Sequence, residues 1–180
     1  RRLFQALPLD LAAPRLSRLA FDEATPAKQA WIAADWLVER LAATDPFDDP
    51  PATPVSRLRW IYVEALRGSA RRQTLEESEV CAALAAVVDS DAGAVRCERL
   101  GCALLSNTAI APTIRLAALD LLLQQEAPPW TQIATACVDE NETVRRGALA
   151  RIGAGSVREA VATLVRLALN ANAPGDVRFE

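Results

Sequence analysis

Five arginines and two aromatic residues are interleaved in one stretch of this 180-residue chain. Basic side chains bind phosphates and aromatic rings stack on bases, so the combination predicts an anion or nucleic-acid patch. The alternative is an amphipathic helix whose arginines face solvent while Trp60 lies partly in the core. Glu76, Glu77 and Glu79 follow directly and could neutralise the basic charge. The patch comprises Arg57, Arg59, Arg67, Arg71 and Arg72, with Trp60 and Tyr62 between them.

Residues suited to catalysis or metal binding are sparse. The chain has no histidine, which excludes Ser–His and Cys–His nucleophilic pairs and every histidine metal site. Its four cysteines form no C-x-x-C pair, so we expect buried thiols instead of a zinc site. The glycine-rich segment 153–156 lacks the lysine and the preceding strand of a phosphate-binding loop, and it predicts a tight turn. We therefore predict no enzymatic activity, no metal and no cofactor.

The composition predicts an all-α fold. Apolar residues make up 51% of the chain, are mostly Ala and Leu, and include few aromatics, which favours helices over strands. The net charge of −3 argues against a general nucleic-acid binder, which normally carries a basic surplus. No apolar run is long enough to span a membrane.

Residues that start, cap or end helices divide the chain into about ten predicted helices. Proline at a first helical position predicts starts near Pro26, Pro54 and Pro112, because its missing N–H costs nothing there. Asn141 is expected to cap another helix, which ends at Gly153. Capping boxes are predicted at Thr74 with Glu77 and at Ser156 with Glu159. The other expected helices occupy 14–21, 93–106 and 129–138, with a last one beginning after 174.

An acidic, proline-rich stretch at 44–53 predicts an exposed loop. It separates an expected irregular N-terminal helical pair, 1–53, from a regular array, 54–180. The chain begins Arg1-Arg2 and contains no methionine. We therefore expect it to be part of a longer protein, with the array continuing beyond residue 180.

One short pattern recurs: a β-branched apolar residue, an arginine, and then apolar residues at helical spacing. A recurring helical pattern is typical of a solenoid. Its copies begin at Val95, Ile114, Val144 and Val177, and the last three lie 30 and 33 residues apart. The segments 139–153 and 113–122 resemble the HEAT family, particularly its short bacterial variety. In the copy at Val144, the residues Val144, Ala148 and Ile152 form one apolar stripe.

The HEAT resemblance implies a right-handed α-α superhelix of antiparallel helix pairs. It also implies that Asp139, in a turn within a pair, bonds Arg145 of the following helix, with Arg178 as a further candidate. The resemblance covers residues 93–180, extends to 54–92 by helix pattern only, and carries little information about function.

The resulting functional hypothesis is a non-catalytic scaffold for protein–protein interaction, or a regulatory segment of a larger cytoplasmic protein. Its partner would be another protein or another domain of the parent chain, with acidic character. The side chains expected to bind it are Arg146, Arg151 and Trp130. One alternative is a nucleic-acid-binding helical repeat with DNA-glycosylase-like architecture. The other is a lyase-type HEAT protein that handles a chromophore, which is an analogy at the level of fold alone.

Overall fold

The computed structural model describes residues 9–40, 51, 53–67, 76–89, 91–153, 161–163, 165–166 and 169. This part of the chain is all-α and contains no strand. None of its helices is both long and apolar enough to cross a membrane. The helices are α2 (Leu9–Phe21), α3 (Ala27–Arg40), α4 (Pro54–Arg67), α5 (Glu77–Ala85), the 3-10 helix η2 (Ala86–Asp89), α6 (Ala94–Leu105), α7 (Pro112–Leu123), α8 (Trp130–Ala136) and α9 (Glu142–Gly153).

Several helices begin where the sequence predicts. Both α4 and α7 start at a proline, Pro54 and Pro112. Asn141 caps α9, because its Oδ1 accepts hydrogen bonds from the backbone N–H groups of Thr143 and Val144. The cap satisfies donors that have no partner within the helix.

Two other boundaries differ from the prediction. The first described helix begins at Leu9, and Pro14, which was expected near its start, lies inside it. The N-cap position of α5 is taken by Glu76, without a side-chain cap bond. Thr74, the predicted cap of the box with Glu77, lies outside the described residues. The second predicted box, Ser156 with Glu159, and the copy at Val177 lie outside the described residues.

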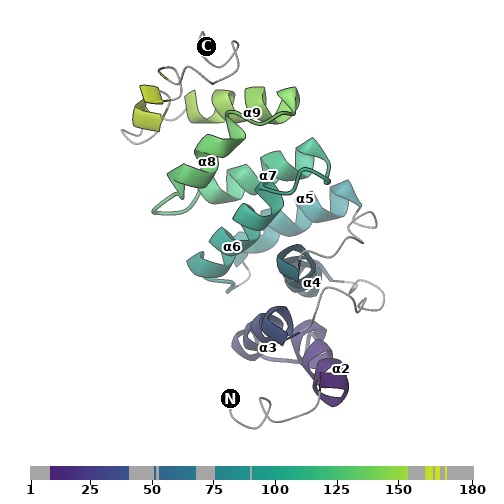
Figure 1. Ribbon diagram of the computed structural model, residues 1–180. Helices are drawn as coiled ribbons and strands as arrows, with labels where there is room; N and C mark the ends of the chain where they lie inside the picture. The colour runs from purple at the N-terminus through teal and green to yellow at the C-terminus, as the bar shows by residue number, and fades with distance from the viewer. Residues whose placement is uncertain are drawn as a thin grey trace. The chain divides into compact units, whose positions relative to one another are not determined.

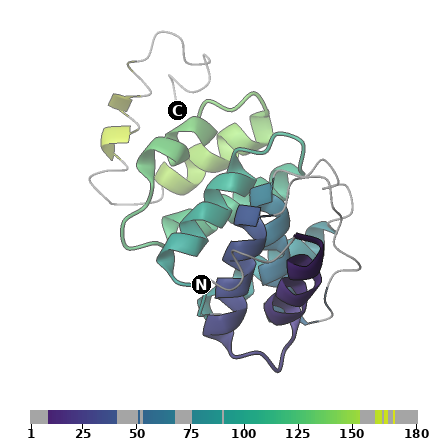
Figure 2. The same ribbon diagram turned by 60° about the horizontal axis from the view of Figure 1, so that its bottom comes forward.

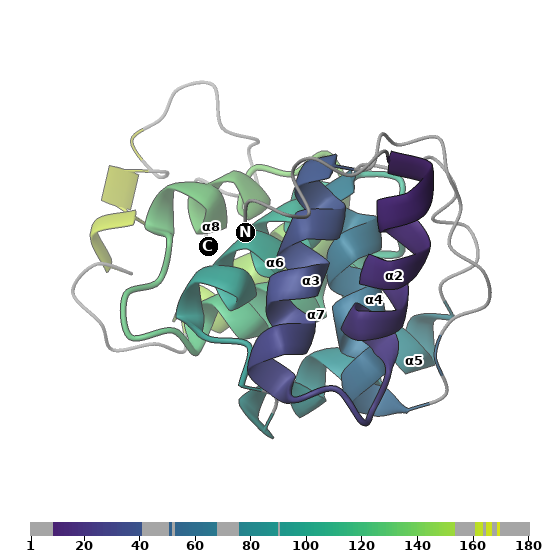
Figure 3. The same cartoon turned by 90° about the horizontal axis from the view of Figure 1, so that it is seen from below.

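The chain divides into two compact units, Arg1–Arg96 and Cys97–Glu180. In the first unit α4 contacts α2, α3, α5 and η2, and Figure 3 shows α4 beside α2 and α3. Because helices cover α4 on several sides, its residues are buried around most of its circumference. Trp31 of α3 packs edge-on against Tyr62 of α4, with ring centroids 5.5 Å apart.

In the second unit α9 contacts both α7 and α8 (Figure 1). The stripe predicted for α9 is confirmed, since Val144, Ala148 and Ile152 are all buried. In α7 the matching residue Ile114 is also buried. Figure 2 shows α8 and α9, the two bright-green helices, lying against each other.

Val95 behaves differently from the other described copies of the pattern. It is 71% exposed, whereas Ile114 and Val144 are buried. The arginine after it, Arg96, belongs to the first unit and donates to Asp35 of α3. The copy at Val95 is therefore not equivalent to the other two in its packing.

Candidate functional site

The described members of the predicted basic patch do not form a solvent-facing arginine surface. Arg59 and Arg67 are buried within the first unit, and Trp60 is only 7% exposed. Arg57 is nearer the surface, but its Nη1 lies 2.5 Å from Glu79 Oε1 and its Nε donates to the Pro51 carbonyl. Arg71 and Arg72 lie outside the described residues. The burial of Trp60 agrees with the predicted amphipathic helix. The burial of Arg59 and Arg67 does not, because that interpretation placed the arginines in solvent.

The two buried arginines of α4 differ in their partners. Arg67 Nη1 donates to Glu64 Oε1, one turn earlier on the same helix, at 3.4 Å. Arg59 has a buried Nε with no hydrogen-bond partner in the described part of the chain. Burial lowers the pKa of the Arg59 guanidinium, and the charge of Glu23 opposes that shift.

A polar cluster that the sequence analysis missed lies elsewhere in the first unit. Arg96 donates to both carboxylate oxygens of Asp35, with Nη2 2.7 Å from Oδ2. Asp35 Oδ1 also accepts a hydrogen bond of 2.8 Å from the Tyr62 hydroxyl. The Arg96 guanidinium lies over the Trp31 ring, 5.6 Å from its centroid.

This cluster of Trp31, Asp35, Tyr62 and Arg96 joins side chains from α3, α4 and the start of α6. Trp31 and Tyr62 are almost fully buried, so neither ring is open for stacking against a ligand. Asp35 and Arg96 already satisfy each other. The cluster therefore positions helices, and its geometry suits a structural role.

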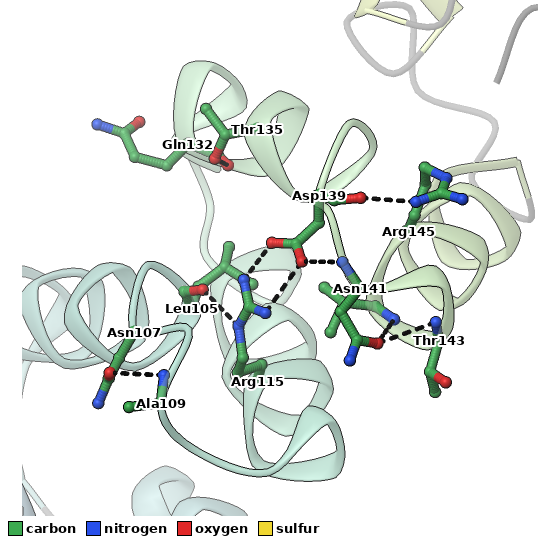
Figure 4. A network of polar contacts seen from close by, with 11 residues as sticks. Leu105, Asn107, Ala109, Arg115, Gln132, Thr135, Asp139, Asn141, Thr143 and Arg145 are labelled. Atoms are coloured by element: carbon green, nitrogen blue, oxygen red, sulfur yellow. Dashed lines mark hydrogen bonds and ion pairs between the residues drawn. The ribbon is translucent and has the colours of Figure 1, made fainter. Parts of the chain in front are cut away.

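The second unit contains a network centred on Asp139 (Figure 4). Asp139 lies in the turn between α8 and α9, and its carboxylate forms an ion pair with Arg115 of α7. Arg115 Nε donates in addition to the Leu105 carbonyl, at 2.9 Å. The Arg115 side chain is only 4% exposed and that of Asp139 is 11% exposed, so water screens this pair weakly.

Arg145, the residue that the HEAT resemblance assigned to Asp139, does contact it, but at a different atom. Its Nη1 donates to the main-chain carbonyl of Asp139 at 2.7 Å. The carboxylate instead accepts from Arg115, which belongs to the preceding copy of the pattern. Arg178, the further candidate, lies outside the described residues.

Several effects act on the Asp139 carboxyl group. Burial raises its pKa, but hydrogen bonds from Arg115 and the Asn141 N–H, with the positive charges of Arg115 and Arg145, outweigh burial and lower the pKa overall. Asp139 is therefore a stable anion. A depressed pKa suits an ion-pair anchor and is the opposite of what a general acid requires.

The residues predicted to bind a partner occupy different environments on α8 and α9. Arg146 projects into solvent, and its weak pair with Glu142 has both side chains about 60% exposed. Arg151 is half-buried and is held by Asp120 of α7 through two hydrogen bonds, the shorter 2.6 Å long. Trp130 is half-buried at the first position of α8. Of the two arginines, Arg146 is the more accessible to an external partner.

The cysteines and acidic residues are the remaining candidates for reactive or metal-binding groups. All four cysteines are free thiols. Burial raises the pKa of the Cys137 thiol to about 11, which makes it a poor nucleophile at neutral pH. Among the described residues no group of three His, Cys, Asp or Glu side chains could hold a metal ion.

Comparison of the chain with family models, curated proteins and solved structures found no match.

Proposed function

We propose that the chain is a non-catalytic scaffold for protein–protein interaction, built as a HEAT-like right-handed superhelix of helix pairs. The packing of α7 against α9 supports this architecture, since these are the second helices of successive predicted pairs. Two arginine–aspartate contacts accompany this packing. Arg115 of α7 pairs with Asp139 in the turn before α9, and Arg151 of α9 pairs with Asp120 of α7. Residues 30 apart in the predicted repeat, Ile114 and Val144, are both buried.

The observation that carries the proposal is the difference between neighbouring arginines on α9. Arg145 donates to a main-chain carbonyl of its own unit and is used internally. Arg146, the next residue, points into solvent and pairs, among the described residues, with the exposed Glu142. Such exposed pairs contribute at most about 1 kcal/mol, so a carboxylate on a partner can displace Glu142.

The proposed binding face combines Arg146 with the half-buried Trp130 and the charged Arg151. Arginine and tryptophan contribute disproportionately to the binding energy of protein interfaces. Because Asp120 already neutralises Arg151, we assign Arg151 a supporting position and Arg146 the direct contact. The partner is an acidic segment of another protein or of the parent chain. A cytoplasmic location is part of the proposal, because free thiols persist in a reducing compartment.

The test is photo-crosslinking in the native cell, with a photoreactive amino acid at position 146 or, as a control, at position 18. Arg18 is an exposed arginine on α2 and lies in the other unit. We expect one discrete protein adduct from position 146 and none of the same mass from position 18. Arg146→Gln should reduce partner recovery in a separate pull-down, whereas Arg18→Gln should not. The absence of a position-specific adduct would contradict the proposal.

Nucleic-acid binding is the competing outcome of the same study. A scaffold should not bind a labelled oligonucleotide in a salt-dependent manner, whereas a nucleic-acid binder loses affinity steeply as salt rises. The burial of Arg59 and Arg67 removes two of the cations on which that alternative depended. Tight, salt-sensitive binding that Arg57→Ala weakens would favour the alternative over the scaffold.

A further inference from the structure

Helix α4 holds an arginine that the fold buries without providing a partner. Arg59 is 3% exposed, and its Nε has no hydrogen-bond partner among the described residues. The residues one turn away on the same helix, Ser56, Tyr62 and Val63, are also buried. The Arg59 side chain therefore extends from a buried face of α4. A guanidinium carries five N–H donors and cannot lose its charge at physiological pH. Burying the Nε–H of this group without an acceptor is unfavourable.

Other buried arginines of the chain show how the fold normally satisfies such a group. Arg115 forms an ion pair with Asp139 and also donates to the Leu105 carbonyl. Arg67 donates from Nη1 to Glu64 on its own helix, although its Nε, like that of Arg59, has no hydrogen-bond partner among the described residues. For Arg59 the charge identified nearby is that of Glu23, an exposed residue in the turn between α2 and α3. Glu23 attracts the guanidinium through space, but no ion pair joins them in the described structure.

We propose that Arg59 is the anchor of a binding site for a small oxyanion, a phosphate or a carboxylate, inside the first unit. The planar guanidinium fork matches two adjacent oxygens of either group and binds them through two parallel hydrogen bonds. The indole Nε1 of Trp60 is likewise buried without a partner among the described residues, but consecutive side chains of a helix do not face each other, so Arg59 alone anchors the site. The site belongs to the first unit, whereas the residues of the proposed interaction face belong to the second.

The burial of Arg59 limits the ligand to a small molecule or ion. A nucleic-acid backbone or an exposed peptide segment needs an open surface, whereas 97% of the surface of this residue is covered. A free phosphate or a short carboxylate can enter such a site and replace the lost water contacts. The proposed ligand therefore differs from the nucleic acid that the sequence pattern suggested for an exposed arginine patch.

The first experiment follows the arginine Nε–Hε resonances of the ¹⁵N-labelled chain by NMR while inorganic phosphate or, separately, acetate is added at constant ionic strength. We expect one resonance to shift and saturate, and to be missing in Arg59→Met. The matched control is Arg57→Met, which removes an arginine two residues away that is already paired with Glu79. This control should retain the shifting resonance. The anion that saturates at the lower concentration identifies the preferred ligand class.

Thermal unfolding provides a second measurement that does not depend on assignment. Millimolar phosphate should raise the Tm of the wild-type chain and of Arg57→Met, but not that of Arg59→Met. Excluded salts stabilise proteins in general, so an equal rise in all three would overturn the proposal. So would the absence of any saturable NMR shift with both anions in the wild-type chain.

A variant of Glu23 separates the oxyanion site from an internal salt bridge and remains informative if Arg59→Met does not fold. Removing a nearby negative charge should strengthen phosphate binding by about threefold in Glu23→Gln, because the anion is no longer repelled. If Glu23 is instead the counter-ion of Arg59, the wild-type chain will not bind phosphate. Glu23→Gln will then have a lower Tm, and the proposal is wrong.

Discussion

The guanidinium of Arg115 and the carboxylate of Asp139 join two parts of the fold that lie 24 residues apart in the chain. Arg115 comes from α7, and Asp139 comes from the turn that leads into α9. The same turn accepts a hydrogen bond from Arg145 through the Asp139 carbonyl. One aspartate therefore links α7 to α9, with its side chain bound to Arg115 and its main-chain carbonyl bound to Arg145.

Removing one member of this pair should destabilise the second unit. Arg115→Met leaves the Asp139 carboxylate covered and without its main partner, and we expect the free energy of unfolding to fall by about 2–4 kcal/mol. The matched control is Arg146→Met, which disrupts an exposed pair and should change stability by less than about 0.5 kcal/mol. Urea unfolding measures both, and hydrogen exchange should place the loss in α7–α9. Equal effects of the two variants would show that the Arg115 pair contributes no more than a surface pair.

Stability should also decrease in acid because of Asp139. Its pKa is lower in the folded chain than the ordinary value of 3.8, so the folded state favours the ionised form. This contribution is complete above the unfolded pKa and is lost as the pH falls through the lower folded pKa. We expect Asp139→Asn to have a shallower decline of unfolding free energy below pH 4 than the wild-type chain. Urea titrations at several acidic pH values test this, and parallel declines would assign the acid sensitivity to other carboxylates.

Local sequence signals predicted helix starts and the apolar stripe, but not the partners of the charged residues. Pro54, Pro112 and Asn141 mark helix starts because their effect is confined to the first turn. The choice between Arg115 and Arg145 as the partner of the Asp139 carboxylate is different. It depends on the packing of α7 against α9, which one repeat copy does not encode.

The burial of Arg59 and Arg67 was not predictable for a related reason. Periodicity within a single helix identifies one apolar face, whereas α4 is covered by several other helices. The pairing of Asp35 with Arg96 spans 61 residues, and no spacing rule connects them. The sequence positions of Trp31, Asp35 and Arg96 therefore do not predict that these side chains meet, because their contact depends on how the helices pack.

The cysteines should differ in reactivity according to their burial. Cys137 and Cys97 are buried, whereas Cys81 and Cys102 are half-buried. Burial raises the pKa of the Cys81 and Cys102 thiols, and neighbouring glutamates raise it further, so we expect slow labelling at these two positions. Cys137, with a pKa of about 11, should be labelled only after unfolding. Maleimide labelling at pH 8 with peptide mapping tests the order, which rapid native labelling of Cys137 would contradict.

Two glycines inside helices should respond in opposite ways to the same substitution. A Cβ at Gly101 of α6 would lie 2.6 Å from Leu122 Cδ2, 2.7 Å from its Cγ and 3.3 Å from the Ala118 carbonyl oxygen. Leu122 is fully buried and cannot move aside, so Gly101→Ala should cost about 1–3 kcal/mol in unfolding free energy. The nearest atoms to a Cβ at Gly147 of α9 would be the terminal methyl groups of Leu116, at 2.7 and 2.9 Å, and Arg151 Nη1 at 3.3 Å.

Leu116 is half-buried and can change rotamer. Gly147→Ala should therefore be neutral, or stabilising by up to about 1 kcal/mol, because alanine has the higher helix propensity. Both variants can be compared by urea unfolding with circular dichroism under identical conditions. The close approach of α6 to α7 at Gly101 predicts that Gly101→Ala is the less stable of the two. A less stable Gly147→Ala would mean that Leu116 cannot yield, and that α7 and α9 pack at Gly147 as tightly as α6 and α7 do at Gly101.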